Sequence, residues 1–323
     1  MEIISRMSIA PFLRTAAPDA PRVARGLLLA VAAAVALASC ATVPQRTQSQ
    51  WLGALPQDAT MYASLSVPHS LAFLQKTLAQ AGPDYKDVGT LMERTSRMVA
   101  AVTLQEGQAA RFSLLALGNY PAGIIGMRLS GSKDWHREAS GRSQYWQSSK
   151  IGVQVSVPNN SILLAANGDI VPLLGRYADP YPVTMPPDVS SDMESMDVVV
   201  YLPRLPGALS HTSSSGMAIP IHEVWVDAAK ASGGYALTGT ANTESEKDAR
   251  LFVLVLRLGI VSWMKTQNVP NASERLKTIS VVSSANQVKL SGLSLSEDEL
   301  LSVLRSLLKG ASPPPEAEAQ ASE

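Results

Sequence analysis

The side chains with the widest chemistry are the only cysteine, Cys40, and four scattered histidines. A cysteine can act as a nucleophile, bind a metal or carry a lipid, and a histidine can act as a base or a metal ligand. The histidines lie at positions 69, 136, 211 and 222, without the spacing of metal ligands. The sequence contains neither a Gly-x-Ser-x-Gly motif nor a phosphate-binding loop. We therefore expect no enzyme, no metal centre and no cofactor.

The setting of Cys40 favours lipid attachment. Several arginines precede Leu27–Leu37, an uncharged run that is too short to cross a bilayer and is typical of a secretory signal. Residues 37–40, Leu-Ala-Ser-Cys, resemble the bacterial lipobox. This resemblance implies cleavage before Cys40 and attachment of fatty acyl chains such as palmitate. The alternative is an incidental cysteine after an ordinary signal peptide, and the start codon is either Met1 or Met7.

The composition of the chain indicates how it is divided. The tether after the cysteine is polar, the last residues are rich in Pro, Ala and Glu, and a Pro-rich segment separates two patterned regions. We expect a signal peptide over 1–39, the lipidated cysteine and tether over 40–53, a first unit over 54–177, a linker over 178–196, a second unit over 197–310 and a disordered tail over 311–323.

The hydrophobic pattern predicts the secondary structure of the two units. Helices are expected over 70–82, 87–104, 168–177, 219–232, 244–267 and 296–310. Strands are expected over 61–67, 111–120, 197–203 and 234–243, with hairpins that turn at Asn159-Asn160 and Ala285-Asn286. This order predicts an α/β fold of the α+β type, with two similar units that each have a mainly antiparallel sheet packed with amphipathic helices. The alternative is one sheet fused across both units, because open edges can pair.

The last predicted helix has the clearest start. Ser296 and Glu299 have the spacing of a capping box, and Gly310 follows the last turn. The acidic residues over 297–299 are favoured by the positive end of a helix dipole, so we do not interpret them as a pair of catalytic carboxylates.

The helix over 244–267 is unusually apolar. A narrow polar stripe, placed at 100° per residue, is formed by Glu246, Arg250, Arg257, Lys247 and Lys265. The apolar side chains that cover the rest of this helix are Phe252, Val255, Leu256, Leu258, Ile260 and Trp263. Such a helix either lies buried between a sheet and a neighbouring element or lies in a membrane interface with its charged side chains toward the head groups.

Two other groups of side chains have a structural and a functional interpretation. The helix predicted over 87–104 carries Met92 and Met98, which suit either a core or an adaptable membrane-facing surface. Aromatic side chains in the first unit either line a sugar or peptide site or pack in a hairpin core; they are Trp135, Tyr145 and Trp146.

The charge balance excludes one class of partner. The chain has 27 basic and 27 acidic residues, so it has no overall positive field with which to hold nucleic acid. Its hydrophobic content of 46% is sufficient for a packed core.

The lipobox cysteine, the tether, the two units and the apolar stretch DARLFVLVLRLGIVSWM together resemble the spirochaete (treponemal) outer-membrane lipoproteins with membrane-inserting amphipathic helices. This resemblance implies a lipid-anchored protein in the periplasmic leaflet of the outer membrane. It also implies that the protein perturbs the membrane and binds or transfers lipid, with membrane lipid as its partner.

Two other functions remain open at the level of sequence. The chain is alternatively a periplasm-facing structural or interaction module, active through a homo-oligomer or a periplasmic protein partner, with no membrane activity beyond its anchor. A catalytic site assembled only in three dimensions is the remaining alternative.

Overall fold

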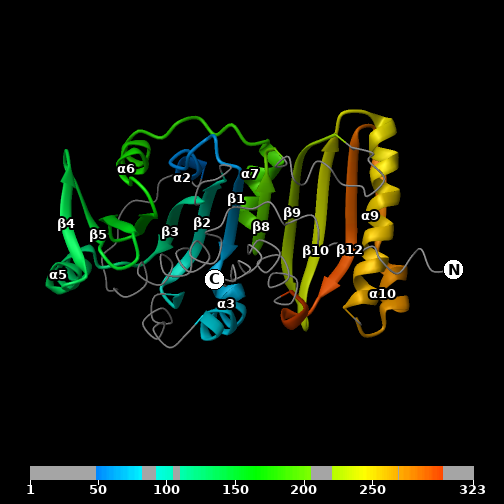
Figure 1. The fold of residues 1–323 in the computed structure, drawn as a ribbon, viewed down its shortest axis with the longest axis horizontal. Coiled ribbons are helices and arrows are strands. Elements are labelled where there is room, and N and C mark those ends of the chain that lie inside the picture. The colour runs from blue at the N-terminus through cyan, green and yellow to red at the C-terminus, as the bar shows by residue number, and fades with distance from the viewer. Residues whose placement is uncertain (1–48, 82–91, 105–109, 205–219, 268, 301–323) are drawn as a thin grey trace, which may run out of the picture.

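A single antiparallel sheet of twelve strands runs through the computed structural model, which describes residues 49–81, 92–104, 110–204, 220–267 and 269–300 (Figure 1). The strand order is β11-β12-β10-β9-β8-β1-β2-β3-β7-β6-β5-β4. The predictions for the signal peptide, for Cys40, for the tail and for most of the last helix fall outside the described residues.

Strands and helices are interspersed along the chain, often as two or more strands in succession. The strands are β1 (Met61–Ser66), β2 (Thr95–Thr103), β3 (Arg111–Gly118), β4 (Trp135–Ser140), β5 (Ser143–Ser148), β6 (Gln154–Asn159), β7 (Ile162–Ala166), β8 (Val198–Leu202), β9 (Ile221–Ala231), β10 (Gly234–Thr243), β11 (Ser280–Ser284) and β12 (Gln287–Leu295). The helices are α2 (Ser49–Leu52), α3 (Val67–Ala81), α5 (Ala122–Gly131), α6 (Val171–Ala178), α7 (Pro187–Ser195), α9 (Glu246–Thr266) and α10 (Ala272–Thr278).

The two halves of the chain repeat one topology. From the centre outward, the first half has the order β1-β2-β3-β7-β6 and the second half has the matching order β8-β9-β10-β12-β11. The first half continues with β5 and β4, which have no counterpart in the second half. The halves meet where β1 pairs antiparallel with β8, from Tyr62 opposite Tyr201 to Leu65 opposite Val198. The α+β class with mainly antiparallel pairing is therefore confirmed. The two similar units share one sheet, which is the fused arrangement that the sequence left open.

Helices cover both faces of the sheet in its first half. On one face, α3 and α5 enclose a core that includes Met98, Phe112 and Leu163. On the other face, α2, α6 and α7 enclose a second core that includes Val99 and Leu164. Successive residues of a strand point to opposite faces, so these strands are apolar at consecutive positions.

A third, smaller core lies toward the other end of the sheet. There α9 and α10 pack against β11 and β12, and the core includes Val281 and Val288. Figure 1 shows α9 at the end of the molecule opposite to β4 and α5.

Two predicted helices are strands in the structure. Residues 95–103 of the helix expected over 87–104 form β2, and the helix expected over 219–232 is replaced by β9. Burial on both faces places apolar residues at many successive positions, and such a run also matches spacings of three and four. The β-branched residues in both segments favour an extended backbone.

The Pro-rich segment over 178–196 contains a helix that its composition does not suggest. Pro187 occupies the first turn of α7, where a missing backbone N–H breaks no intrahelical hydrogen bond. Val189 and Met193 of α7 are buried against the sheet. Arg97 of β2 holds this helix by donating from Nη1 to the carbonyl oxygens of Met193 at 2.8 Å and Met196 at 3.0 Å.

The capping box predicted at Ser296 is present. The Glu299 N–H donates to the Ser296 hydroxyl at 3.2 Å, and the Ser296 N–H donates to the Glu299 carboxylate at 2.7 Å. The Arg275 guanidinium of α10 also binds this carboxylate, which holds the pKa of Glu299 below its usual value. Within the described residues, helical structure follows over 297–300.

Asp227 is a buried carboxyl group at the centre of the second half. It lies on β9 and is 5% exposed, and its Oδ1 has no hydrogen-bond partner among the described residues. Its Oδ2 accepts a hydrogen bond from the Thr238 hydroxyl at 3.4 Å. Burial, together with the nearby charge of Asp192, raises the pKa of Asp227 to about 6.

The raised pKa of Asp227 predicts how the free energy of unfolding changes with pH. The folded state binds the Asp227 proton more tightly than the unfolded chain, so the cost of ionisation grows as the pH rises from about 4 to about 6 and is fully present above that range. We expect Asp227→Asn to raise the free energy of unfolding by about 1–2 kcal/mol at pH 7.5 and by almost nothing at pH 4. Urea denaturation at several pH values measures this difference. A stability change that is the same at every pH would contradict this account.

Candidate functional site

The local sequence accounts for both ends of α9, the longest helix among the described residues. Ser245 caps its N-terminus, where the hydroxyl accepts a hydrogen bond from the Asp248 N–H at 3.2 Å. Acidic side chains in the first turn and Lys265 in the last turn match the helix dipole. With 21 residues the helix is roughly 30 Å long. The helix predicted over 244–267 is therefore confirmed.

One side of α9 is attached to the sheet. Ala249, Ile260 and Met264 are buried there. Larger side chains of this inner face are partly buried against strands β11 and β12; they are Phe252, Val253, Leu256 and Trp263. These contacts bury enough apolar surface to fix the orientation of the helix.

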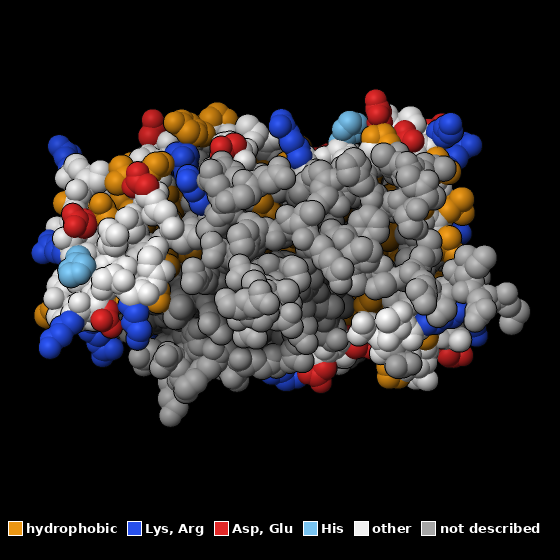
Figure 2. Space-filling model, in the orientation of Figure 1, with side chains coloured by type: hydrophobic (Ala, Val, Ile, Leu, Met, Phe, Trp, Pro, Cys, Tyr) orange, Lys and Arg blue, Asp and Glu red, His pale blue; other side chains and the backbone are white. Residues whose placement is uncertain are grey.

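The opposite side of α9 faces solvent and is also apolar. Leu258 is 71% exposed, Leu254 is 58% exposed and Val255 is 36% exposed, while Leu251 is half-buried. At 100° per residue these four side chains cover about 100° of the helix surface, and we call them the outer apolar stripe. Figure 2 shows hydrophobic side chains at the end of the molecule that α9 occupies. A contiguous row of this kind indicates an interaction site, whereas single exposed apolar residues are ordinary.

Charged side chains border the outer apolar stripe. Lys247 and Lys265 are exposed and lie at its two ends. On the side that faces the sheet edge, Arg257 donates from Nη2 to the carbonyl oxygen of Val281 on β11 at 2.8 Å. The outer surface of α9 is therefore apolar along its middle and carries a lysine near each end, and in the first turn Glu246 lies beside Lys247.

The structure divides the residues predicted to contact a membrane. Val255 and Leu258 lie on the outer apolar stripe. The residues that instead pack toward the sheet are Phe252, Leu256, Ile260 and Trp263. Met92 and Met98 are buried in the core beneath α3 and α5, as in the core interpretation of these residues.

The sequence did not single out Leu251 and Leu254, although both belong to the stripe. A signal for them exists: Lys247 and Lys265 share the angular position of Leu258, and exposed lysines mark the solvent side of a helix. Because α9 is apolar on both sides, the positions of the two lysines indicated its solvent-facing side only weakly.

Two other features, a metal-binding cluster and a membrane-spanning helix, are absent from the described part of the chain. Among those residues, no group of three or more His, Cys, Asp or Glu side chains is placed to hold a metal ion. None of the helices in the described ranges is both long enough and apolar enough to span a membrane.

Comparisons with known proteins identify relatives of this fold. A family model described as outer membrane-associated lipoprotein TP0453 matches residues 46–243. Crystal form III of the treponemal protein TP0453 is similar with a TM-score of 0.59 and 16% identity, over 79% of this chain and 97% of that chain. Crystal form IV gives a TM-score of 0.58 and 16% identity, over 78% of this chain and 95% of that chain. No curated protein sequence matches the chain.

The family match covers the first half of the fold and part of the second half. It ends at Thr243, so α9 lies beyond it. The resemblance to treponemal outer-membrane lipoproteins that the sequence suggested is confirmed. Because the family model matches more than half of the 323 residues, the chain belongs to the family of the outer membrane-associated lipoprotein TP0453.

Proposed function

We propose that this outer membrane-associated lipoprotein is anchored through lipid on Cys40, faces the periplasm and makes a second membrane contact through α9. The observation that carries the proposal is the outer apolar stripe with a lysine at each end. A helix with this pattern lies parallel to the bilayer surface, with its apolar side chains among the acyl chains and its lysines at the head groups.

The size of the stripe indicates why the anchor is needed. At about 25 cal/mol per Å² of apolar surface, its three exposed side chains contribute about 4 kcal/mol on entering an apolar phase. That energy alone corresponds to a dissociation constant of about 1 mM. Each lysine adds about 1 kcal/mol at an anionic surface. A lipid anchor on Cys40 raises the effective concentration of the bilayer around α9, so this weak contact is formed most of the time.

Lipid binding or transfer requires a larger movement of the same helix. If α9 left the sheet, its inner side chains, including Phe252 and Trp263, would enter the membrane as well, and the apolar surface of β11 and β12 would become available to lipid. The core beneath α9 is the smallest of the three cores. The main contacts of α9 are with strands β10, β11 and β12 and with helix α10. The cost of this movement is the loss of the contacts that α9 makes with this core and of the hydrogen bond from Arg257 to Val281.

The outer apolar stripe predicts a specific effect on membrane binding. We expect the chain from Ala41 onward, which lacks the anchor, to float with vesicles that contain phosphatidylglycerol. Leu258→Asp removes about 2 kcal/mol of apolar transfer energy and should lower the fraction bound at least tenfold. Val282→Asp is the matched control, because Val282 is 52% exposed on β11 and does not belong to α9.

The flotation experiment separates membrane contact from protein contact. Equal flotation of the wild type and Leu258→Asp would contradict the membrane role of the stripe. If sedimentation then showed that the same substitution dissociates a homo-oligomer, the interaction-module alternative would replace it.

The two faces of α9 also predict opposite effects on stability. Leu258→Asp changes an exposed position and should alter the free energy of unfolding by less than about 1 kcal/mol. Ile260→Asp places a carboxylate in the core beneath α9 and should lower it by at least about 3 kcal/mol. Thermal and urea denaturation measure both values. Comparable losses in the two variants would show that Leu258 is not a solvent-facing residue.

A further inference from the structure

One side of α3 contacts the second half of the fold. His69, Phe73 and Lys76 lie on this side, because residues three and four positions apart share one face of a helix. The His69 ring is hydrogen-bonded through Nδ1 to the carboxylate of Asp197, the residue before β8. The Phe73 ring packs edge to face on Tyr235 of β10, with the ring centroids 6.2 Å apart. Helix α3 belongs to the first half, so its side chains join the two halves in addition to the pairing of β1 with β8 (Figure 1).

The third contact of this side is ionic. Lys76 Nζ lies 3.3 Å from Glu297 Oε2 and 3.2 Å from Asp298 Oδ1. Both acidic residues belong to the last described segment, residues 296–300, which we call the C-terminal turn. From β9, Lys230 Nζ forms an ion pair with the other oxygen of the same carboxylate, Glu297 Oε1. Two lysines, one from each half, therefore converge on one carboxylate.

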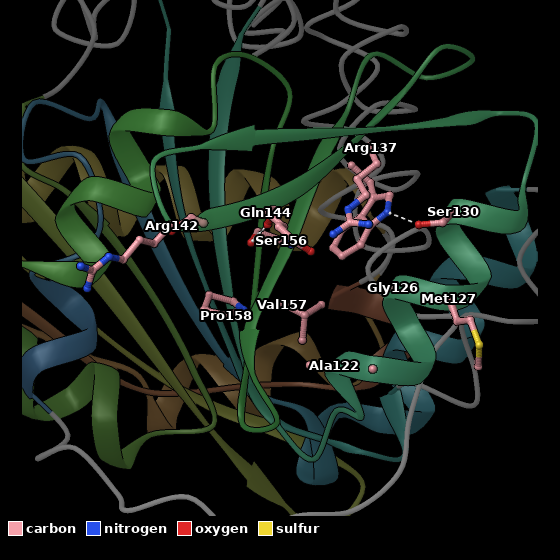
Figure 3. Close-up of a pocket in the computed structure, with 13 residues that line it drawn as sticks. Ala122, Gly126, Met127, Ser130, Arg137, Arg142, Gln144, Ser156, Val157 and Pro158 are labelled. Atoms are coloured by element: carbon pink, nitrogen blue, oxygen red, sulfur yellow. Dashed lines mark hydrogen bonds between the residues drawn. The ribbon is translucent and has the colours of Figure 1, made fainter.

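This convergence is not found between the arginines beside α5. Arg137 and Arg142 line a groove between α5 and strands β5 and β6, but Figure 3 shows their side chains extending in different directions. Lys76 and Lys230 instead each hold one oxygen of Glu297. Lys230 first, and then Lys76, keep the pKa of the Glu297 carboxyl below its usual value, so this group stays ionised. The two lysines thus form a site with room for one oxyanion, and Glu297 occupies it.

The ionic contact is accessible to solvent. The side chain of Lys76 is 47% exposed and that of Lys230 is 35% exposed. Ion pairs at this exposure are weakened by salt, and other anions can reach the same ammonium groups. Phosphate groups are strong competitors, because they present several charged oxygens to two cations at once. The contact between α3 and the C-terminal turn therefore depends on the anions around the protein.

A second attachment holds the C-terminal turn on its own half. Arg275 of α10 donates to both oxygens of Glu299, from Nη1 at 2.6 Å and from Nη2 at 3.0 Å. Leu295, which precedes the turn, is buried. The bidentate pair with Arg275 is less exposed than the pairs with the two lysines. If the lysines were occupied by other anions, the turn would stay with α10 and separate from α3.

We propose that α3 is an ionic clasp between the two halves, closed by Glu297 on Lys76 and Lys230 and opened by phosphate groups that replace this carboxylate. The phosphate belongs either to the head groups of anionic lipid or to a soluble ion, because both present the same oxyanion. Opening moves the C-terminal turn and α10 away from α3 and leaves the pairing of β1 with β8 intact. The clasp does not involve α9, so it can fail without affecting the membrane contact proposed for that helix.

The test measures the distance between α3 and α10 in the mature lipoprotein, held in neutral detergent micelles. Gln75→Cys and Lys277→Cys carry spin labels for pulsed electron paramagnetic resonance, because both positions are exposed and lie outside the clasp. We expect a single short distance in sodium chloride. Phosphatidylglycerol in the micelles, inorganic phosphate at the same ionic strength, or both should shift it to a longer distance. A shift with phosphatidylglycerol alone would assign the clasp to the lipid surface, and a shift with inorganic phosphate alone would assign it to a soluble ion.

Variants locate the clasp. Lys76→Gln with Lys230→Gln should give the longer distance in sodium chloride alone, whereas Lys76→Arg keeps the charge and should keep the short distance. Arg250→Gln is the matched control, because it removes an exposed ion pair with Glu246 that lies within α9 and joins no two elements. It should leave the distance unchanged. Circular dichroism and the melting temperature confirm that each variant folds.

Three results would overturn the proposal. These are an unchanged distance with both sources of phosphate, a short distance in the lysine double variant, and an equal shift in Arg250→Gln. The first removes the trigger, the second shows that the lysines do not hold the clasp closed, and the third assigns the shift to a general loss of surface charge.

Discussion

The antiparallel pairing of β1 with β8 is the contact on which the arrangement of the other elements depends. It joins two repeats of one topology into a single sheet, and the rings of Tyr62 and Tyr201 stack across it with their centroids 6.1 Å apart. Helices cover both faces of this sheet in its first half. The outermost strands are farther from that double layer. The outer apolar stripe of α9 lies at one of these ends.

The edges of the sheet differ in how they avoid further pairing. The edge strand β4 carries the charged residues Arg137 and Glu138, which discourage another strand from adding to it. The edge strand β11 has no charged residue, but Arg257 of α9 occupies its Val281 carbonyl. The helix proposed to contact the membrane thus also protects an edge. Movement of α9 away from the sheet would leave this carbonyl without that partner.

Sequence patterns predicted more of the fold than of the site. The capping residues and apolar spacing predicted α9 and the start of the last helix because these signals act within a few residues. The helix predicted over 87–104 was wrong from Thr95 onward, because a strand buried on both faces has no period of two. Which side of α9 faces solvent depends on contacts with β11 and β12, so the sequence named Val255 and Leu258 but also four residues of the inner face. Trp146 was interpreted as either a ligand-lining or a core residue, and the structure buries it in the core beneath α5, as in the core interpretation.

The central claim is that the outer side of α9 enters the membrane while the protein is anchored. A single-site probe tests it directly. The mature lipoprotein is prepared with Leu258→Cys or Val282→Cys, each thiol is labelled with an environment-sensitive fluorophore, and the protein is bound to vesicles that contain a nitroxide-labelled lipid. The account predicts a blue shift and strong quenching at position 258, and a water-like, weakly quenched probe at position 282. A water-like probe at position 258, or equal quenching at both positions, would contradict it.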